Sequence, residues 1–124
     1  MGGEGDSPLR PVLIVDDSDV VRRVLVKRVT ALGLGVREES HAAAAKAVNA
    51  TELACAVIDL ELDDGNGAEV AAALAATDPA LPIAFFTGGA ALAVVERARA
   101  FGPVFAKPDE LDAVVAWVAS AARA

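Results

Sequence analysis

The chain has 124 residues and a formal net charge of −7. Its length is that of one domain, and its acidity disfavours nonspecific binding to nucleic acid or to an anionic membrane surface. Cys55 is the only cysteine, which excludes an internal disulfide and a metal site built from several cysteines. No apolar run approaches the roughly 18 residues that a membrane-spanning helix needs. We therefore expect a globular protein with no direct nucleic-acid or membrane contact.

The first nine residues are rich in glycine and lack the apolar stretch of a signal peptide. We expect a flexible N-terminal segment over residues 1–9 and one domain over residues 10–122. The absence of an apolar leader in this sequence also predicts a cytoplasmic protein.

From residue 12 onward, short apolar runs alternate five times with longer Ala-rich helical patterns. The run at 12–15 is uninterrupted, which is typical of a strand buried on both faces. Five successive strand–helix units predict a parallel sheet with helices on both faces. The expected strands are 12–15, 34–37, 54–58, 83–86 and 103–105; the expected helices end near 32, 49, 76, 100 and 121, with Ser18 or Asp19, Ser40 and Asp109 as caps of the first, second and last.

Polar side chains follow four of these strands. The carboxyl ends of parallel strands meet at one edge of the sheet, where ligands of such folds bind. Two like charges at about 4 Å repel by roughly 4 kcal/mol at an effective dielectric of about 20, so a cluster of carboxylates there predicts a bound cation. Oxygen donors favour a hard ion such as Mg²⁺. The residues concerned are Asp16 and Asp17, Asp59, Thr87 and Lys107.

The hydroxyl of Thr87 and the ammonium of Lys107 complete this set chemically. Both would stabilise an anionic group that lies against the predicted cation. A metal ion, an ammonium group and a hydroxyl donor around a carboxylate are the parts that phosphoryl transfer to that carboxylate requires.

Four sequence segments occur in order, each at the end of an expected strand: V-L-I-V-D-D-S (12–18), A-V-I-D-L-E-L-D-D-G-N-G (56–67), F-F-T-G-G (85–89) and F-A-K-P (105–108). Together they resemble the receiver domains of bacterial two-component response regulators, over about residues 10–122. The resemblance implies a flavodoxin-like α/β fold, a doubly wound five-stranded parallel sheet with strand order 2-1-3-4-5, as in the chemotaxis regulators.

The resemblance also implies a role for the residues at the sheet edge. Asp59 would accept a phosphoryl group from a sensor histidine kinase or a histidine phosphotransfer protein. Mg²⁺ would be held by Asp16, by Asp17 and by the backbone carbonyl of Glu61. The domain would catalyse only its own phosphorylation and dephosphorylation, and it would signal by contact with a downstream protein target.

On the other side of the site, Thr87 and Lys107 would bind the phosphoryl group. Gly88 would leave access for the attacking group, and Gly88 with Gly89 would form a soft switch loop. The peptide bond between Lys107 and Pro108 is often cis in this family, which only an X-Pro bond makes inexpensive.

Several positions depart from the family pattern. Asp63 stands where proline is usual, and Glu61 places an acid at a position that tunes the lifetime of the phosphoryl group. Val104 stands at the position of an aromatic residue whose rotamer commonly changes with phosphorylation. The segment 102–107 is about two residues shorter than usual. We therefore expect the signal to leave the site by a route other than an aromatic side chain.

Two other functions fit parts of the sequence. The stretch 17–21 matches the D-x-D-x-V signature of haloacid dehalogenase-like phosphohydrolases, with Asp17 as nucleophile and Asp19 as acid and base. The short chain and the lack of a later acidic pair disfavour it. A degenerate receiver that acts only as a protein-binding module is the other alternative. The chain is either a stand-alone receiver or part of a longer regulator.

Some residues favour ordinary structural roles. Asp63 and Asp64 are interpreted as solubilising surface acids, His41 as a solvated residue and Cys55 as a buried, inert thiol. Trp117 lies off the apolar stripe of the last helix, so it belongs either to the edge of the core or to a partner surface.

Overall fold

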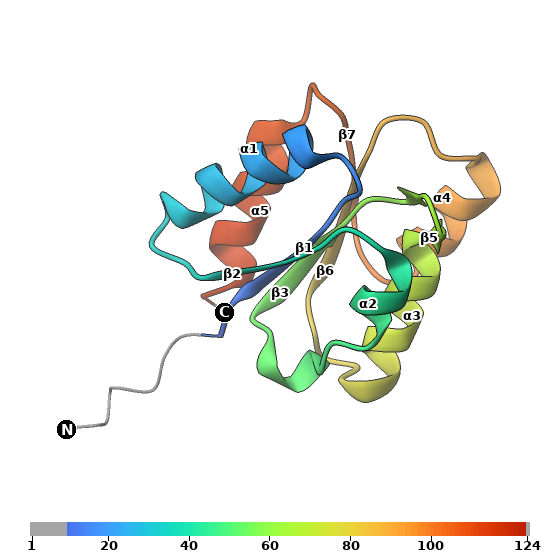
Figure 1. Ribbon diagram of the computed structural model, residues 1–124, viewed down its shortest axis with the longest axis horizontal. Coiled ribbons are helices and arrows are strands. Elements are labelled where there is room, and N and C mark those ends of the chain that lie inside the picture. Colours follow the sequence, from blue (N-terminus) through green and yellow to red (C-terminus); the bar gives the residue numbers. More distant parts are fainter. Residues whose placement is uncertain (1–9, 124) are drawn as a thin grey trace.

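The computed structural model describes residues 10–123, and the predicted flexible segment 1–9 lies outside them. Its main sheet has five parallel strands in the order β2-β1-β3-β6-β7 (Figure 1). β4 and β5 form a separate hairpin, so β6 and β7 are the fourth and fifth strands of the main sheet. The observed order is therefore the predicted 2-1-3-4-5. The strands are β1 (Val12–Val15), β2 (Val36–Glu39), β3 (Cys55–Ile58), β6 (Ile83–Thr87) and β7 (Val104–Ala106).

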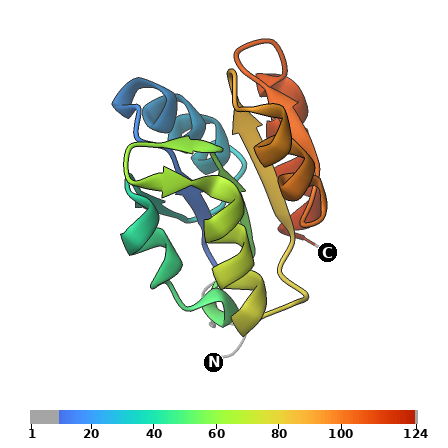
Figure 2. The same ribbon diagram turned by 90° about the vertical axis from the view of Figure 1, so that its right-hand side faces the viewer.

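Helices cover both faces of this sheet. α1 (Asp19–Thr30) and α5 (Leu111–Ala121) lie on one face, and α2 (Ala42–Lys46), α3 (Gly67–Thr77) and α4 (Leu92–Arg99) lie on the other (Figures 1 and 2). Within residues 10–123, no helix has both the length and the apolar character needed to cross a bilayer.

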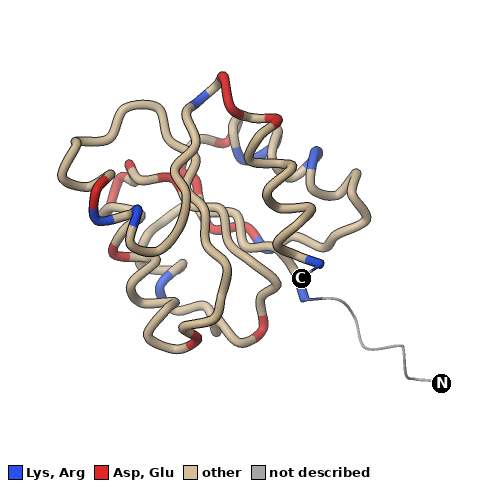
Figure 3. The backbone as a smooth tube through the Cα atoms, turned by 180° about the vertical axis from the view of Figure 1, so that it is seen from behind, with Lys and Arg blue, Asp and Glu red and all other residues tan. Residues whose placement is uncertain are grey.

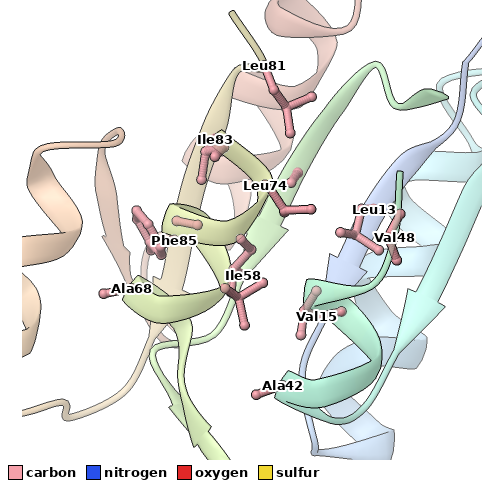
Figure 4. Packing of buried hydrophobic residues seen from close by; sticks show 14 of the residues in the cluster. Leu13, Val15, Ala42, Val48, Ile58, Ala68, Leu74, Leu81, Ile83 and Phe85 are labelled. Atoms are coloured by element: carbon pink, nitrogen blue, oxygen red, sulfur yellow. The ribbon is translucent and has the colours of Figure 1, made fainter. Parts of the chain in front are cut away.

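The three central strands β1, β3 and β6 are buried along their whole length. Successive side chains point to opposite faces, so each strand contributes to two cores. Leu13 and Ile58 pack toward α2, α3 and α4 (Figure 4), whereas Ile14 and Val57 pack toward α1 and α5. Burial on both faces explains why these strands have continuous apolar runs rather than alternating ones. Trp117 is half-buried at the edge of the second core.

Some predicted boundaries were wrong. β2 begins at Val36 rather than at 34, because its register pairs Val12 with Val36 and Val15 with Glu39. As an edge strand it leaves Arg37 and Glu38 exposed, so its apolar residues end at Val36 and did not mark the rest of the strand. α2 ends at Lys46 rather than near 49, and a 3₁₀ turn, η2 (Ala50–Glu52), follows it.

The predicted caps differ in outcome. Ser18 caps α1 as expected, accepting a hydrogen bond from the Val21 amide. Asp109 does not cap α5, which is preceded by Glu110 without a side-chain cap; the Glu110 carboxylate instead accepts a hydrogen bond from the Ala106 amide at 2.8 Å. Ser40 does not cap α2 either, since the residue before that helix is His41.

A short antiparallel hairpin follows β3 and was not predicted. It consists of β4 (Glu61–Leu62) and β5 (Gly65–Asn66), joined by Asp63 and Asp64. The Asp64 carboxylate accepts hydrogen bonds from the amides of Ala42 at 2.6 Å and Ala43 at 3.0 Å. It thereby caps α2 from a distant part of the chain, which corrects its interpretation as a solubilising acid.

The hairpin leads directly into α3, whose first residue packs tightly against the end of β3. Asn66 caps the helix by accepting a hydrogen bond from the Glu69 amide at 3.0 Å. At Gly67, a side-chain methyl group would overlap the backbone carbonyl of Asp59. Only glycine allows this close approach of helix and strand. The contact joins Asp59, which precedes the hairpin, to Gly67, which follows it.

Gly67→Ala should therefore lower the free energy of unfolding by about 1–3 kcal/mol through overpacking. Gly35→Ala is the matched control: its methyl group would meet Pro11 at 3.9 Å, an ordinary contact. That control should be neutral or more stable by up to about 1 kcal/mol, because alanine restricts the unfolded chain. Urea denaturation of both variants measures the difference, and equal stabilities would contradict this account of the α3 junction.

Candidate functional site

Three carboxylates converge at the carboxyl edge of the sheet. Asp16 and Asp17 follow β1, and Asp59 follows β3. The parallel register pairs Val15 with Ile58, and this pairing brings the next residues of both strands together. One carboxylate oxygen from each of the three acids lies within 4.8 Å of the others. Asp16 and Asp59 are buried, whereas Asp17 is half-buried.

Local hydrogen bonds fix the position of Asp16. One of its carboxylate oxygens accepts a hydrogen bond from the Ser18 amide at 2.9 Å. Its backbone carbonyl accepts one from Nη1 of Arg22 at 2.7 Å, and Arg22 also pairs with Asp19 and Glu38. The sequence analysis missed this role of Arg22, which has no motif to mark it. The arginine links the β1–α1 turn to β2.

Lys107 joins two of the three acids. Its Nζ lies 2.8 Å from Oδ2 of Asp16 and 3.1 Å from Oδ2 of Asp59. The Lys107 amide donates to the Thr87 carbonyl at 2.9 Å, which extends the pairing of β6 and β7 by one residue. Its ammonium lies 5.9 Å from the ring centroid of Phe86, and the peptide bond to Pro108 is cis.

The ionisation of this pair follows from burial and charge. Burial raises the pKa of Asp16 even though the Lys107 hydrogen bond opposes that shift. Burial disfavours the charge on Lys107, but its contacts with Asp16 and Asp59 outweigh burial and raise the pKa of the ammonium. Lys107 is therefore held as a cation between two acids. Burial makes the ionised form of Asp16 costly.

Thr87 ends β6 beside this cluster. It is buried, and its hydroxyl oxygen makes no hydrogen bond within residues 10–123. A buried hydroxyl without a partner is uncommon in folded proteins, so it is available to a group that enters the site. Gly88 and Gly89 follow it and are exposed.

Glu61 lies across the site from these glycines. Its amide donates to Oδ1 of Asp59 at 3.1 Å. Its carboxylate lies close to Gly89, where Oε1 would be 3.9 Å from an added Cβ atom. The two carboxylate oxygens of Asp59 thus have different partners: Oδ1 is bound by the Glu61 amide and Oδ2 by the Lys107 ammonium.

The donor set fits a hard divalent cation. Three carboxylates face the single ammonium of Lys107, which leaves an excess of negative charge that a cation would offset. All the side-chain donors are oxygens, as Mg²⁺ prefers. Asp63 lies beside this cluster, and its hydrogen bond with Asp17 and the repulsion between the two acids raise the pKa of the exposed Asp63 carboxyl group. The sequence analysis had interpreted this acid as a surface group only.

Comparison with known proteins gives consistent results. The family model described as response regulator receiver domain matches residues 12–117. The photosynthetic apparatus regulatory protein RegA of Cereibacter sphaeroides is 34% identical over 94 residues, and that of Rhodobacter capsulatus is 35% identical over 94 residues. Each alignment covers 75% of this chain and 51% of the relative, so the chain spans about half the length of these proteins.

Solved structures share the fold. The non-phosphorylated HemR receiver domain from Leptospira biflexa aligns with a TM-score of 0.80 at 22% identity, covering 95% of this chain and 96% of that one. A response regulator receiver domain protein from Clostridium thermocellum aligns with a TM-score of 0.80 at 15% identity, covering 93% and 95%. With the family match over most of its length, the chain belongs to the response regulator receiver domain family of two-component signalling.

Proposed function

We propose that this receiver domain accepts a phosphoryl group on Asp59 from a phosphohistidine of a sensor kinase or phosphotransfer protein. The observation that carries the proposal is the position of the Asp59 carboxylate, held by Lys107 at 3.1 Å and by the Glu61 amide at 3.1 Å beside two further acids. Asp16, Asp17 and the Glu61 backbone carbonyl would hold Mg²⁺. The bound ion would neutralise negative charge on the transferring group.

Each residue of the site has a part in this reaction. A carboxylate oxygen of Asp59 forms the new O–P bond while the N–P bond of the phosphohistidine breaks, and the imidazole nitrogen keeps the electron pair. The Lys107 ammonium pairs with a phosphoryl oxygen, and the unpartnered Thr87 hydroxyl donates a hydrogen bond to another. Hydrolysis of the acyl phosphate by water restores the carboxylate and releases inorganic phosphate, so in this proposal the domain catalyses its own phosphorylation and dephosphorylation.

The charge distribution bears on its partners. The net charge is −7, and Lys and Arg segments are interspersed with acidic ones in the view of Figure 3. An acidic chain disfavours binding to nucleic acid phosphates, so the proposed output is contact with a downstream protein. The proposal places the chain in the cytoplasm, where it would meet the phosphodonor.

The phosphohydrolase alternative has little support. In that mechanism Asp19 would act as acid and base next to Asp17. The Asp19 side chain is 75% exposed and pairs with Arg22 at 2.6 Å. A general acid needs to reach the reacting group, whereas the Asp19 side chain is exposed at the surface and paired with Arg22. The binding-module alternative rests only on the departures in output geometry, since the chemical groups around Asp59 are present.

Asp59 should be the only phosphoacceptor. Acetyl phosphate with Mg²⁺ should add one phosphoryl group to the wild-type chain, and Asp59→Asn should remain unmodified because the amide is not a nucleophile. Intact mass spectrometry with mapping of the modified residue measures this. A label that persists in Asp59→Asn and maps to Asp17 would support the phosphohydrolase mechanism instead.

Asp17→Asn should weaken Mg²⁺ binding by about tenfold or more, or ~1.4 kcal/mol, and should slow phosphorylation in parallel. Loss of one carboxylate also removes repulsion with Asp16 and Asp59, so the metal-free variant should be at least as stable as the wild type. Titration calorimetry and thermal denaturation measure the two effects. Asp112→Asn, which removes an exposed acid paired with Arg28 on α5, is the control. Equal affinities in all three proteins would refute the metal assignment.

The output should begin at the Gly88–Gly89 loop. Val104 is half-buried against the core, and no large ring at that position can change between exposed and buried rotamers. Phosphorylation adds a charge of about −1.5 to −2, toward which the Thr87 hydroxyl should move. Beryllofluoride should therefore shift the amide resonances of residues 87–95 while the Val104 rotamer stays the same. The reverse pattern, with Val104 changing and residues 88–90 silent, would exclude this route.

A further inference from the structure

The tip of the β4–β5 hairpin is bound to the beginning of α2. Both carboxylate oxygens of Asp64 are used, one by the Ala42 amide at 2.6 Å and the other by the Ala43 amide at 3.0 Å. His41, which precedes the helix, provides no side-chain cap. An added Cβ at Gly65 would lie 3.3 Å from the Ala42 side chain, so the backbone of the tip also packs on the helix. The bonds to these amides lower the pKa of Asp64.

The base of the same hairpin belongs to the functional site. Glu61 is its first residue, and its amide is bound to Oδ1 of Asp59. Glu61 pairs with Asn66, and the Gly67 amide donates to the Leu60 carbonyl at 3.1 Å. Only Leu62 and Asp63 separate Glu61 from Asp64. Two intervening residues are too few to take up a displacement of the hairpin tip. Such a displacement therefore also moves the backbone of Glu61.

We propose that Asp64 is a positioning residue for the metal site: its two hydrogen bonds to α2 hold the hairpin so that the Glu61 backbone carbonyl is available to Mg²⁺. This inference rests on the proposed function. It assigns α2 to the site as well, since the helix is the fixed point to which the hairpin is attached. By linkage, if the attachment to α2 strengthens Mg²⁺ binding, bound Mg²⁺ stabilises that attachment by the same coupling free energy.

The first test is Mg²⁺ affinity by titration calorimetry on the wild type, Asp64→Asn and Ala44→Gly. Asp64→Asn should bind Mg²⁺ about tenfold more weakly, the scale typical of residues that orient metal ligands. Ala44→Gly weakens the same short helix at an exposed position but keeps the Asp64 side chain, so its affinity should stay close to that of the wild type. Equal losses in the two variants would overturn the proposal, because general weakening of α2 would then suffice.

Loss of a negative charge near the metal is the competing explanation, and salt separates the two. Screening shortens from about 10 Å at 0.1 M to about 3 Å at 1 M ionic strength. The difference between wild type and Asp64→Asn should persist at 1 M if Asp64 acts through the hairpin. A difference that disappears at high salt would assign the effect to charge and would also overturn the proposal.

The second readout is amide hydrogen exchange of Ala42 and Ala43. Mg²⁺ with beryllofluoride should slow their exchange in the wild type and in Ala44→Gly, but not in Asp64→Asn. Unchanged exchange in a wild-type protein that binds Mg²⁺ and beryllofluoride would refute the coupling and leave the proposed function intact. A wild type that binds neither would refute the proposed function, and the inference with it.

Discussion

The bridge that Lys107 forms between Asp16 and Asp59 is the interaction on which the site depends. Without it, two buried carboxylates would face each other at the sheet edge with a third acid close by, a repulsion of roughly 4 kcal/mol per pair at about 4 Å and an effective dielectric of about 20. One ammonium contacts two of the acids, and Asp17 forms no salt bridge with any residue in the range 10–123. The lysine thus offsets only part of the negative charge of the cluster, and the proposed divalent cation would offset the rest.

The strand order of the sheet places this lysine beside the acids. β1 and β3 are neighbours, so their acids follow adjacent strand ends. Lys107 comes from the far side of the sheet, where β7 pairs with β6 and extends the pairing to Thr87. Its ammonium lies over the ring of Phe86, the residue before Thr87 on β6. A parallel sheet is what allows residues separated by 91 positions in the sequence, Asp16 and Lys107, to meet at one edge.

Much of this arrangement follows from the sequence, for a physical reason. Strands buried on both faces must be apolar throughout, so the residue at which each run stops is visible, and Asp16, Asp59 and Thr87 were located in this way. Lys107 follows the partly buried edge strand β7, and the F-A-K-P segment marked it instead. The edge strand β2 and the hairpin gave no such signal, because their side chains are exposed or their strands too short. The cap of α2 by Asp64 joins residues 22 positions apart, and neither residue predicts the other. Arg22 was missed for the same reason.

Two loops of unequal stiffness border the proposed phosphoacceptor. The hairpin is fixed at its base by the packing of Gly67 against the Asp59 carbonyl and at its tip by Asp64 on α2. The Gly88–Gly89 loop on the other side is exposed, and an added Cβ at either glycine would meet no atom closer than 3.8 Å. If the proposed phosphoryl group is added at Asp59, we expect the backbone to rearrange at lower cost on the glycine side. The hairpin would then stay in place while that loop moves, and the change at the surface would be expected in α4, which follows the loop.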